Sequence, residues 1–148
     1  MNRDEINGRI REYEQYCRDR GLPVTVQRRA ILQAVLETTA HPSAEQVFDV
    51  VKERIQGVSR TTVYRALDTL SEAGLITRLP HPTSTGRYDG NTDRHHHVVC
   101  RTCGQVVDVF DKRYDALPLP TRGVGGFRVE DYSVVFVGIC AACRHREN

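Results

Sequence analysis

The sequence predicts an α+β protein built from an N-terminal winged-helix domain and a small C-terminal α/β domain. Three observations lead to this prediction. Apolar residues recur at helical spacing through the first half of the chain, a short hairpin pattern follows, and the second half contains short apolar runs typical of strands. With 148 residues, the chain is long enough for two small domains.

The first half is predicted to be helical, with local signals at the helix ends. One helix covers VQRRAILQAVLE, and a second covers SAEQVFDVVKERIQG, where Ser43 can cap the helix, Gln46 can complete a capping box and Gly57 can end it. A third helix follows in SRTTVYRALDTLSEAG, with Ser59 as its N-cap and Gly74 as its stop. The apolar positions of the three helices are Val26, Ala30, Ile31, Val35, Leu36, Val47, Phe48, Val51, Ile55, Val63, Ala66, Leu67 and Leu70.

A change of pattern after the third helix marks the wing. The strand LITRL, the turn-rich tip PHPTSTG and the return strand RYD predict a β-hairpin, which completes a winged helix. The strands HHVV, QVVDVF and YSVVFVGIC follow, with a short helix around residues 111–117. We place the boundary near residues 86–91, which gives a winged-helix domain of residues 1–88 and a small α/β domain of residues 89–148.

Composition limits the class of protein without identifying it. Hydrophobic residues make up 39% and charged residues 27%, as in a globular protein, and no apolar run approaches the roughly 18 residues of a membrane span. The start, MNRDEINGRI, is too polar for a signal peptide, so we expect a cytoplasmic protein with no membrane partner. A net charge of +2 neither favours nor excludes nucleic-acid binding, which therefore depends on where the basic residues lie.

The third helix has the features of a helix that reads double-stranded DNA. Such a helix buries one face and presents hydrogen-bonding side chains on the other, near its N-terminal end. Arginine can form a forked contact with guanine, and threonine or tyrosine can contact phosphate or a thymine methyl group. The alternative is a solvated helix face, and many winged helices bind protein instead. The candidate DNA-binding residues are Arg60, Thr61, Thr62, Tyr64 and Arg65 on this helix, with Arg28 and Arg29 for phosphate contacts.

The stretch RHHHVVCRTCG contains five side chains that can bind a metal, and strand geometry divides them. Side chains alternate faces along a strand, so Cys100 cannot easily share an ion with His95 and His97. It belongs instead with Cys103 and with the second CxxC pair near the chain end. Four thiolates form the tetrahedral set of a structural zinc site, and metal binding is the better expectation for cysteines in a reducing compartment. The predicted zinc ligands are Cys100, Cys103, Cys140 and Cys143.

His95 and His97 then need partners of another kind. Imidazole with carboxylate suits a harder divalent ion, such as iron, manganese, zinc or cobalt, and Asp89 and Asp108 lie nearby in sequence. His41 precedes a proline between two predicted helices, where the simplest interpretation is a solvated loop residue. As a ligand, it would instead tie the DNA-reading half to the metal-binding half, which is what a switch requires.

The motifs together closely resemble the ferric uptake regulator family of metal-dependent transcriptional repressors. They run nearly from end to end: VTVQRRAIL, HPSAEQVF, SRTTVYRALDTLSEAGL, GRYD, HHHVVCRTCG, VVDVF and ICAAC. The resemblance implies a homodimer that binds a DNA operator through an N-terminal winged-helix DNA-binding domain, residues 1–88, and pairs through a C-terminal metal-binding α/β dimerisation domain, residues 89–148. It also implies a structural Zn(II) held by four cysteines and a regulatory Fe(II) or Mn(II) at the domain junction. Carried over by motif, the regulatory ligands are His41, Asp89, His95, His97 and Asp108.

Within that family, the chain is most similar to the peroxide-responsive regulators. Like them it has Asp at position 108, where iron sensors commonly have Glu. A zinc sensor would be expected to use a cysteine as a regulatory ligand, but Cys17 is far away in sequence. Iron sensors often carry a further site that pairs the middle histidine of the run with a later histidine. His96 is present, but EDYSVV offers no such partner, so no third site is expected.

The leading hypothesis is a repressor that Fe(II) or Mn(II) activates and that peroxide inactivates by oxidising His41 or His95 at the Fe(II) site. The alternative is an iron-level sensor of the same family without histidine oxidation. A non-haem metalloenzyme is a third class, but the sequence shows no substrate-pocket signature or acid–base pair, so no enzyme is expected. Cys17 is predicted to be a half-buried helix residue, and His81 and His145 are predicted to be solvated.

Overall fold

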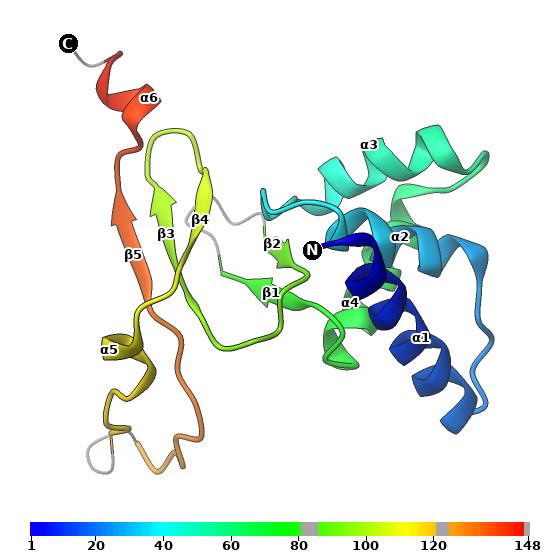
Figure 1. The fold of residues 1–148 in the computed structure, drawn as a ribbon, viewed down its shortest axis with the longest axis horizontal. Helices are drawn as coiled ribbons and strands as arrows, with labels where there is room; N and C mark the ends of the chain where they lie inside the picture. Colours follow the sequence, from blue (N-terminus) through cyan, green and yellow to red (C-terminus); the bar gives the residue numbers. More distant parts are fainter. Residues whose placement is uncertain (81–85, 121–124, 147–148) are drawn as a thin grey trace. The chain divides into compact units, whose positions relative to one another are not determined.

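The computed structural model describes residues 1–80, 86–120 and 125–146, and it divides the chain into two compact units, Met1–Thr92 and Asp93–Asn148 (Figure 1). The first unit contains four helices and a two-stranded sheet, and the second contains a three-stranded sheet with two short helices. This is the expected α+β architecture. The functional boundary expected between residues 88 and 89 stays a prediction, because compactness alone does not define a functional domain.

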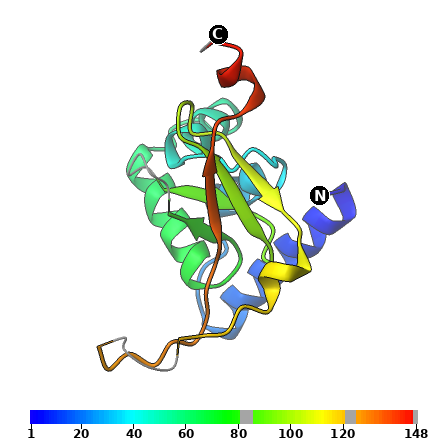
Figure 2. The same ribbon diagram turned by 90° about the vertical axis from the view of Figure 1, so that its left-hand side faces the viewer.

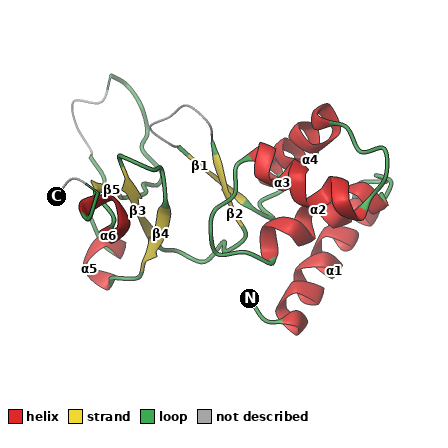
Figure 3. Cartoon of the chain, turned by 90° about the horizontal axis from the view of Figure 1, so that it is seen from above, coloured by secondary structure: helices red, strands yellow, loops and turns green. Residues whose placement is uncertain are grey.

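The first unit is helical up to its hairpin (Figure 3). The expected helices are α2 (Val26–Leu36), α3 (Ala44–Arg54) and α4 (Arg60–Glu72), and α1 (Arg3–Asp19) precedes them. Ser43 and Gln46 form the predicted capping box of α3, and the Ser59 hydroxyl accepts the Thr62 N–H at the start of α4. The predicted N-caps are therefore confirmed, whereas α3 ends at Arg54, before the expected stop at Gly57, and Ile55 is its C-cap and not part of its apolar face.

The core of the first unit is apolar and draws on all four helices. The interior faces contribute Tyr13, Ile31, Leu32, Leu36, Val47, Val51, Val63, Leu67 and Leu70, each at most 1% exposed. Val26, the first residue of α2, is instead 72% exposed. Cys17 lies in α1 and is fully buried, so the expectation of a half-buried cysteine was wrong.

The wing hairpin consists of β1 (Thr77–Leu79) and β2 (Arg87–Asp89), paired antiparallel. The tip expected in PHPTSTG, with His81, falls mostly on residues 81–85, outside the described residues. Beyond β2, Gly90 is buried against the end of α2. A Cβ at this position would lie 2.9 Å from Leu36 Cδ2 and 3.2 Å from Leu36 Cα, so only glycine allows this close approach.

The second unit is a sheet with strand order β4-β3-β5 (Figures 1 and 2). Its strands are β3 (His96–Cys100), β4 (Val106–Val109) and β5 (Val135–Gly138). β3 pairs antiparallel with β4 and parallel with β5. The short helix α5 (Lys112–Asp115) was expected, whereas α6 (Ala141–Arg144) was not. No helix in the described part of the chain combines the length and apolar composition needed to cross a membrane.

Candidate metal centres and nucleic-acid interface

The four CxxC cysteines meet at one end of the second unit. Cys100 ends β3, Cys103 lies in the following turn, Cys140 is the N-cap of α6 and Cys143 lies within α6. The parallel pairing of β3 with β5 brings the two motifs together, because it sets Cys100 opposite Gly138. One sulfur from each cysteine lies within 4.8 Å of the other three.

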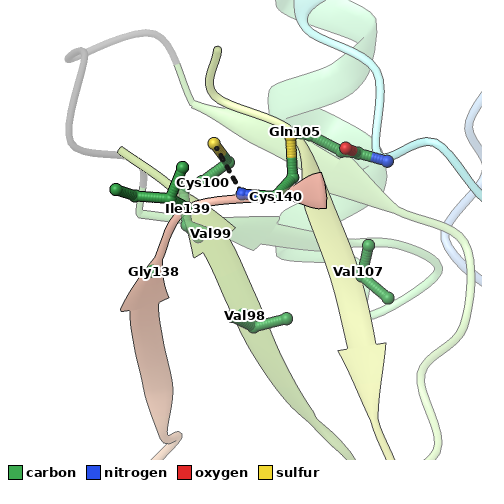
Figure 4. A pocket seen from close by; sticks show the side chains of 8 residues that line it. All are labelled: Val98, Val99, Cys100, Gln105, Val107, Gly138, Ile139 and Cys140. Carbon is green, nitrogen blue, oxygen red and sulfur yellow. Dashed lines mark hydrogen bonds between the residues drawn. The ribbon is translucent and has the colours of Figure 1, made fainter. Parts of the chain in front are cut away.

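The geometry of these thiols fits a tetrahedral zinc site. All four cysteines are free of disulfides, and the Sγ atoms of Cys103 and Cys140 are 3.7 Å apart. Zinc–thiolate bonds of about 2.3 Å place tetrahedral sulfurs roughly 3.8 Å apart, which matches this spacing. The Cys140 backbone N–H donates to Cys100 Sγ at 3.3 Å (Figure 4). This donor is the largest of the causes that lower the pKa of Cys100 to about 6, so the thiol is poised to ionise.

Strand register brings together a group of candidate nitrogen and oxygen ligands in the second unit. His97 in β3 is directly opposite Asp108 in β4, and residues opposite one another in a sheet share a face. The Nε2 atoms of His95 and His97 lie 3.4 Å and 3.7 Å from Asp108 Oδ1. His95 Nδ1 lies 2.7 Å from the Asp93 carbonyl oxygen, which can only accept a hydrogen bond. Nδ1 therefore carries the hydrogen, and Nε2 keeps a lone pair for a metal.

A second group of ligands forms in the first unit, where the segment before α3 runs along the wing. Tyr88 N–H donates to the Pro42 carbonyl at 3.0 Å, and Ser43 forms an antiparallel bridge with Arg87. These contacts hold the segment before α3 against β2, and His41 Nε2 lies 3.3 Å from Asp89 Oδ2. His41 adopts the left-handed φ of 50° and is 2% exposed, so the interpretation as a solvated loop residue was wrong.

The side chain of Gln46 holds this pairing in place. Its Oε1 atom accepts the Ser43 N–H at 2.8 Å and the Arg87 guanidinium at 2.9 Å. It thus ties the start of α3 to β2, beside His41 and Asp89. Sequence analysis identified the cap but missed Arg87, since the link depends on strand pairing between segments far apart in the chain.

Imidazole nitrogens with carboxylate oxygens suit Fe(II), Mn(II) or another hard-to-borderline divalent ion better than thiolates do. The first unit supplies two such side chains, His41 and Asp89, and the second supplies three, His95, His97 and Asp108. All five side chains are buried or partly buried. The residues therefore fit the kind of metal that the sequence predicts, with an incomplete ligand set in each unit considered by itself.

His96 is turned to the other face of the sheet, as strand alternation predicts. Its Nδ1 accepts the Val134 N–H at 3.3 Å, and its Nε2 is 3.2 Å from Asp115 Oδ1. The rings of Tyr114 and Tyr132 flank it at centroid distances of 6.0 Å and 6.3 Å. The His96 side chain therefore contacts Val134, Asp115 and two tyrosines, and lies on the opposite face of the sheet from Asp108.

The candidate DNA-reading residues begin at the N-terminal turn of α4. Thr61, Tyr64 and Arg65 are exposed, while Thr62 is partly buried and contacts the Ser59 hydroxyl at 2.9 Å. Arg60 is exposed but engaged, because its guanidinium lies 2.7 Å from Glu45 Oε1 and stacks over Phe48 at 4.5 Å.

The two arginines of α2 differ in their surroundings. Arg29 is exposed and pairs with Glu14 of α1 at 3.3 Å, whereas Arg28 is partly buried. Both lie in the first turn of the helix, where the Thr25 hydroxyl accepts the Arg28 N–H. That these arginines contact phosphate stays a prediction.

Comparison with known proteins agrees with the fold and the motifs. The model of the ferric uptake regulator family matches residues 19–137. The peroxide operon regulator of Bacillus subtilis is 30% identical, over 94% of this chain and 96% of that protein. Transcriptional regulator FurA of Mycobacterium tuberculosis is 36% identical, over 90% and 91% of the two chains. The iron-containing structure of the Francisella tularensis ferric uptake regulator is 28% identical, over 84% and 96%, with a TM-score of 0.70. This chain therefore belongs to the ferric uptake regulator family, whose members are metal-dependent transcriptional regulators and not enzymes.

Proposed function

We propose that the protein is a DNA-binding repressor that requires a regulatory metal ion and loses its activity when peroxide oxidises the Fe(II) form. The observation that carries this proposal is the presence of two partial sets of candidate ligands, each brought together by contacts between segments distant in the chain. One set, His41 and Asp89, belongs to the DNA-binding unit. The other, His95, His97 and Asp108, belongs to the sheet unit.

A single ion bound by both sets is the arrangement that makes use of all five groups. Two ligands in one unit and three in the other are each fewer than Fe(II) or Mn(II) commonly takes, and five leave one octahedral position open. An ion that binds both sets favours one orientation of the units over others, and so shifts the population toward that state. Metal binding, mainly by residues of the sheet unit, would thereby control how the DNA-binding unit is oriented.

The four-cysteine cluster has a different role in this proposal. Closed tetrahedral thiolate sites hold zinc structurally and leave no position for a substrate. Cys100, Cys103, Cys140 and Cys143 would bind Zn(II) independently of the regulatory ion, since the two groups share no residue. The Francisella relative contains iron, which agrees with a separate regulatory metal in this fold.

The proposed partners are a DNA operator and a second copy of the chain. α4 would enter the major groove with Tyr64 and Arg65, which are exposed on its polar face. Within the described residues, β5 pairs only with β3, and Val137 on it is 62% exposed. An unpaired sheet edge with an exposed apolar side chain favours pairing with another strand, which supports a homodimer through this unit.

Two stimuli, peroxide and the iron level of the cell, are compatible with a repressor that requires a regulatory metal ion. Peroxide sensing is supported by the Bacillus relative, which is named a peroxide operon regulator, and by Asp at position 108. Fe(II) held there would supply the electron that splits hydrogen peroxide into hydroxide and a hydroxyl radical, and His41 or His95 would then be the oxidised ligand. Iron-level sensing is the second candidate, because the Francisella relative is named a ferric uptake regulator and its structure contains iron.

Mass spectrometry of the metal-loaded dimer before and after peroxide separates the two candidates. We expect one oxygen atom to be added to a peptide that contains His41 or His95 when Fe(II) is bound. Manganese loading should prevent the addition, since Mn(II) does not readily split peroxide. Oxidation confined to cysteines, or equal with both metals, would rule out peroxide sensing and favour the iron-level sensor.

A further inference from the structure

Phe110 is an exposed aromatic residue that stacks on one of the regulatory ligands. Its ring lies 5.3 Å from that of His95, centroid to centroid, with 23° between the ring planes. It is nevertheless 70% exposed, so burial in the core does not hold it there. Register explains the contact: His96 is opposite Val109, and the next pair outward is His95 and Phe110.

The orientation of His95 places Phe110 beside the reactive position. His95 Nδ1 is committed to the Asp93 carbonyl at 2.7 Å, so Nε2, which faces Asp108 at 3.4 Å, is the nitrogen available to a metal. His97 meets the His95 ring edge-on at 4.6 Å, and Phe110 covers one face of the same ring. Phe110 is thus an aromatic group in direct contact with a ligand that peroxide chemistry would reach, and it binds no metal itself.

We propose that Phe110 is a second oxidation target of the regulatory site, hydroxylated to a tyrosine isomer when the Fe(II)-loaded protein meets hydrogen peroxide. The proposal rests on the proposed peroxide-sensing function. Fe(II) bound there would supply the electron that splits peroxide into hydroxide and a hydroxyl radical, and the resulting Fe(III) would take one electron back at the end. The radical adds to a ring carbon of Phe110, and the ring then gives up one electron and one proton. The proton combines with the hydroxide, so one peroxide is consumed, one ring C–H becomes C–OH and one water is released.

This reaction would set how efficiently peroxide inactivates the repressor. Each radical that reacts with Phe110 leaves the imidazole ligands unchanged and the iron reduced, so the site stays functional. Each radical that reacts with His41 or His95 damages a ligand. Phe110 and the histidines therefore compete for the same oxidant, and removing the phenyl ring should increase histidine oxidation for a given dose of peroxide.

The chain contains a matched control for random oxidation. Phe127 lies in the same unit and is 79% exposed, slightly more than Phe110, but no aromatic contact with a candidate ligand is seen for it among the described residues. Trypsin should separate the relevant residues, because cleavage after Arg94, Arg101, Lys112 and Arg122 puts His95, Phe110 and Phe127 in different peptides. Fragment ions are needed to separate Phe110 from Cys103, which shares its peptide.

The experiment uses the full-length, zinc-replete protein loaded with Fe(II) or with Mn(II) and treated with hydrogen peroxide. With Fe(II), we expect one added oxygen on Phe110, in the form of hydroxyphenylalanine isomers, together with oxidation of His41 or His95, and only background on Phe127. With Mn(II), all of these should be absent. Phe110→Leu should raise the oxidised fraction of the histidines, and Phe127→Leu should leave that fraction unchanged.

Other outcomes would overturn specific statements. Histidine oxidation without any change at Phe110 would disprove the second target and leave the proposed function intact. Equal oxidation of Phe110 and Phe127 would indicate radicals that diffuse freely, and would also disprove it. Absence of oxidation at both the histidines and Phe110 would contradict the peroxide-sensing function itself. Metal content measured on each variant verifies that the leucine substitutions leave the site loaded.

Discussion

The thiols of Cys100 and Cys143 belong to one cluster, yet their acidities shift in opposite directions. Backbone donors, led by the Cys140 N–H, stabilise the Cys100 thiolate and lower its pKa to about 6. The hydrogen bond with the Cys140 thiol, followed by burial, raises the pKa of Cys143 to about 12. Thiolates this close repel one another, so a divalent cation is needed for all four to be deprotonated at neutral pH.

Serine in place of any one of the four clustered cysteines should therefore abolish zinc binding and destabilise the dimer. Zinc binding contributes roughly 10–16 kcal/mol in small zinc-binding peptides, so its loss should lower the unfolding temperature sharply. Elemental analysis gives zinc per chain, thermal unfolding gives stability, and light scattering after size exclusion gives the oligomeric state.

Cys17→Ala is the matched control for this prediction, because Cys17 is buried in α1 and lies outside the cluster. It should keep its full zinc content, although the cavity it leaves costs some stability. A serine variant that remains a zinc-replete dimer would remove that cysteine from the site.

At the scale of single elements, α4 is the helix on which the DNA prediction rests. Its interior face is locked by Val63, Leu67 and Leu70, each fully buried, so its polar face is fixed in orientation. Arg60 is held by Glu45 and Phe48, whereas the exposed Arg65 shows no ion pair within the described residues. Arg65 and Tyr64 are consequently the residues most available to a base edge.

Arg65→Ala and Tyr64→Ala should abolish specific operator binding while leaving metal content unchanged. A side chain that reads a base contributes about 1–3 kcal/mol of discrimination, and affinity should fall with salt as phosphate contacts release counterions. Fluorescence anisotropy with operator and scrambled DNA measures both effects. Arg18→Ala, an exposed arginine on α1 that contacts Gln15, is the control. Unchanged operator binding in both α4 variants would mean that another element reads the DNA.

Helix ends were predictable because their signals are local. Ser43 and Ser59 cap the helices that follow them, and Gly57 and Gly74 adopt φ angles of 79° and 69° where the sequence placed stops. α1 was less evident, since its buried residues, such as Ile10 and Tyr13, are spread among charged ones. α6 is only four residues long and gave no periodic pattern.

The part of the candidate sites that could be predicted is the part that depends on the alternation of side chains between the two faces of a strand. It separated His95 and His97 from Cys100, and the pairing of β3 with β4 agrees. The burial of His41 and the stack of Phe110 on His95 depend on pairing between distant segments, which periodicity does not reveal. The contact of Arg60 with Glu45 likewise depends on how α3 packs against α4. Metal binding by the five His and Asp residues stays a prediction.

For the whole molecule, the proposal raises the question of how an ion bound by residues of both units would change the DNA binding of the first unit. The chain passes between the units at Thr92 and Asp93. On the first unit, Arg9 of α1 donates to the Leu75 carbonyl at 2.6 Å and to the Thr92 hydroxyl at 3.0 Å. The segment that links the units therefore starts at Thr92, which Arg9 holds in place. A change in the backbone direction after Thr92 would change the orientation of the second unit relative to the first.

His41→Ala tests this coupling, because His41 belongs to the DNA-binding unit and its proposed partners His95, His97 and Asp108 belong to the other. Changes around a metal site commonly cost 10–100-fold in metal affinity even outside the ligand shell, so loss of a ligand should cost at least about 100-fold. Metal-dependent operator binding should fall accordingly. The four-cysteine zinc should remain, because it shares no residue with this site. The loss of the buried contact between His41 and Asp89 should lower the unfolding temperature, but far less than it weakens metal-dependent DNA binding. His145→Ala, at an exposed histidine in the last turn of the described chain, should behave as the wild type.

Titration of DNA binding with Mn(II), which avoids oxidation, measures the metal response of each variant. If His41→Ala responds to Mn(II) as the wild type does, the two ligand sets do not share an ion, and metal binding must act within the second unit alone.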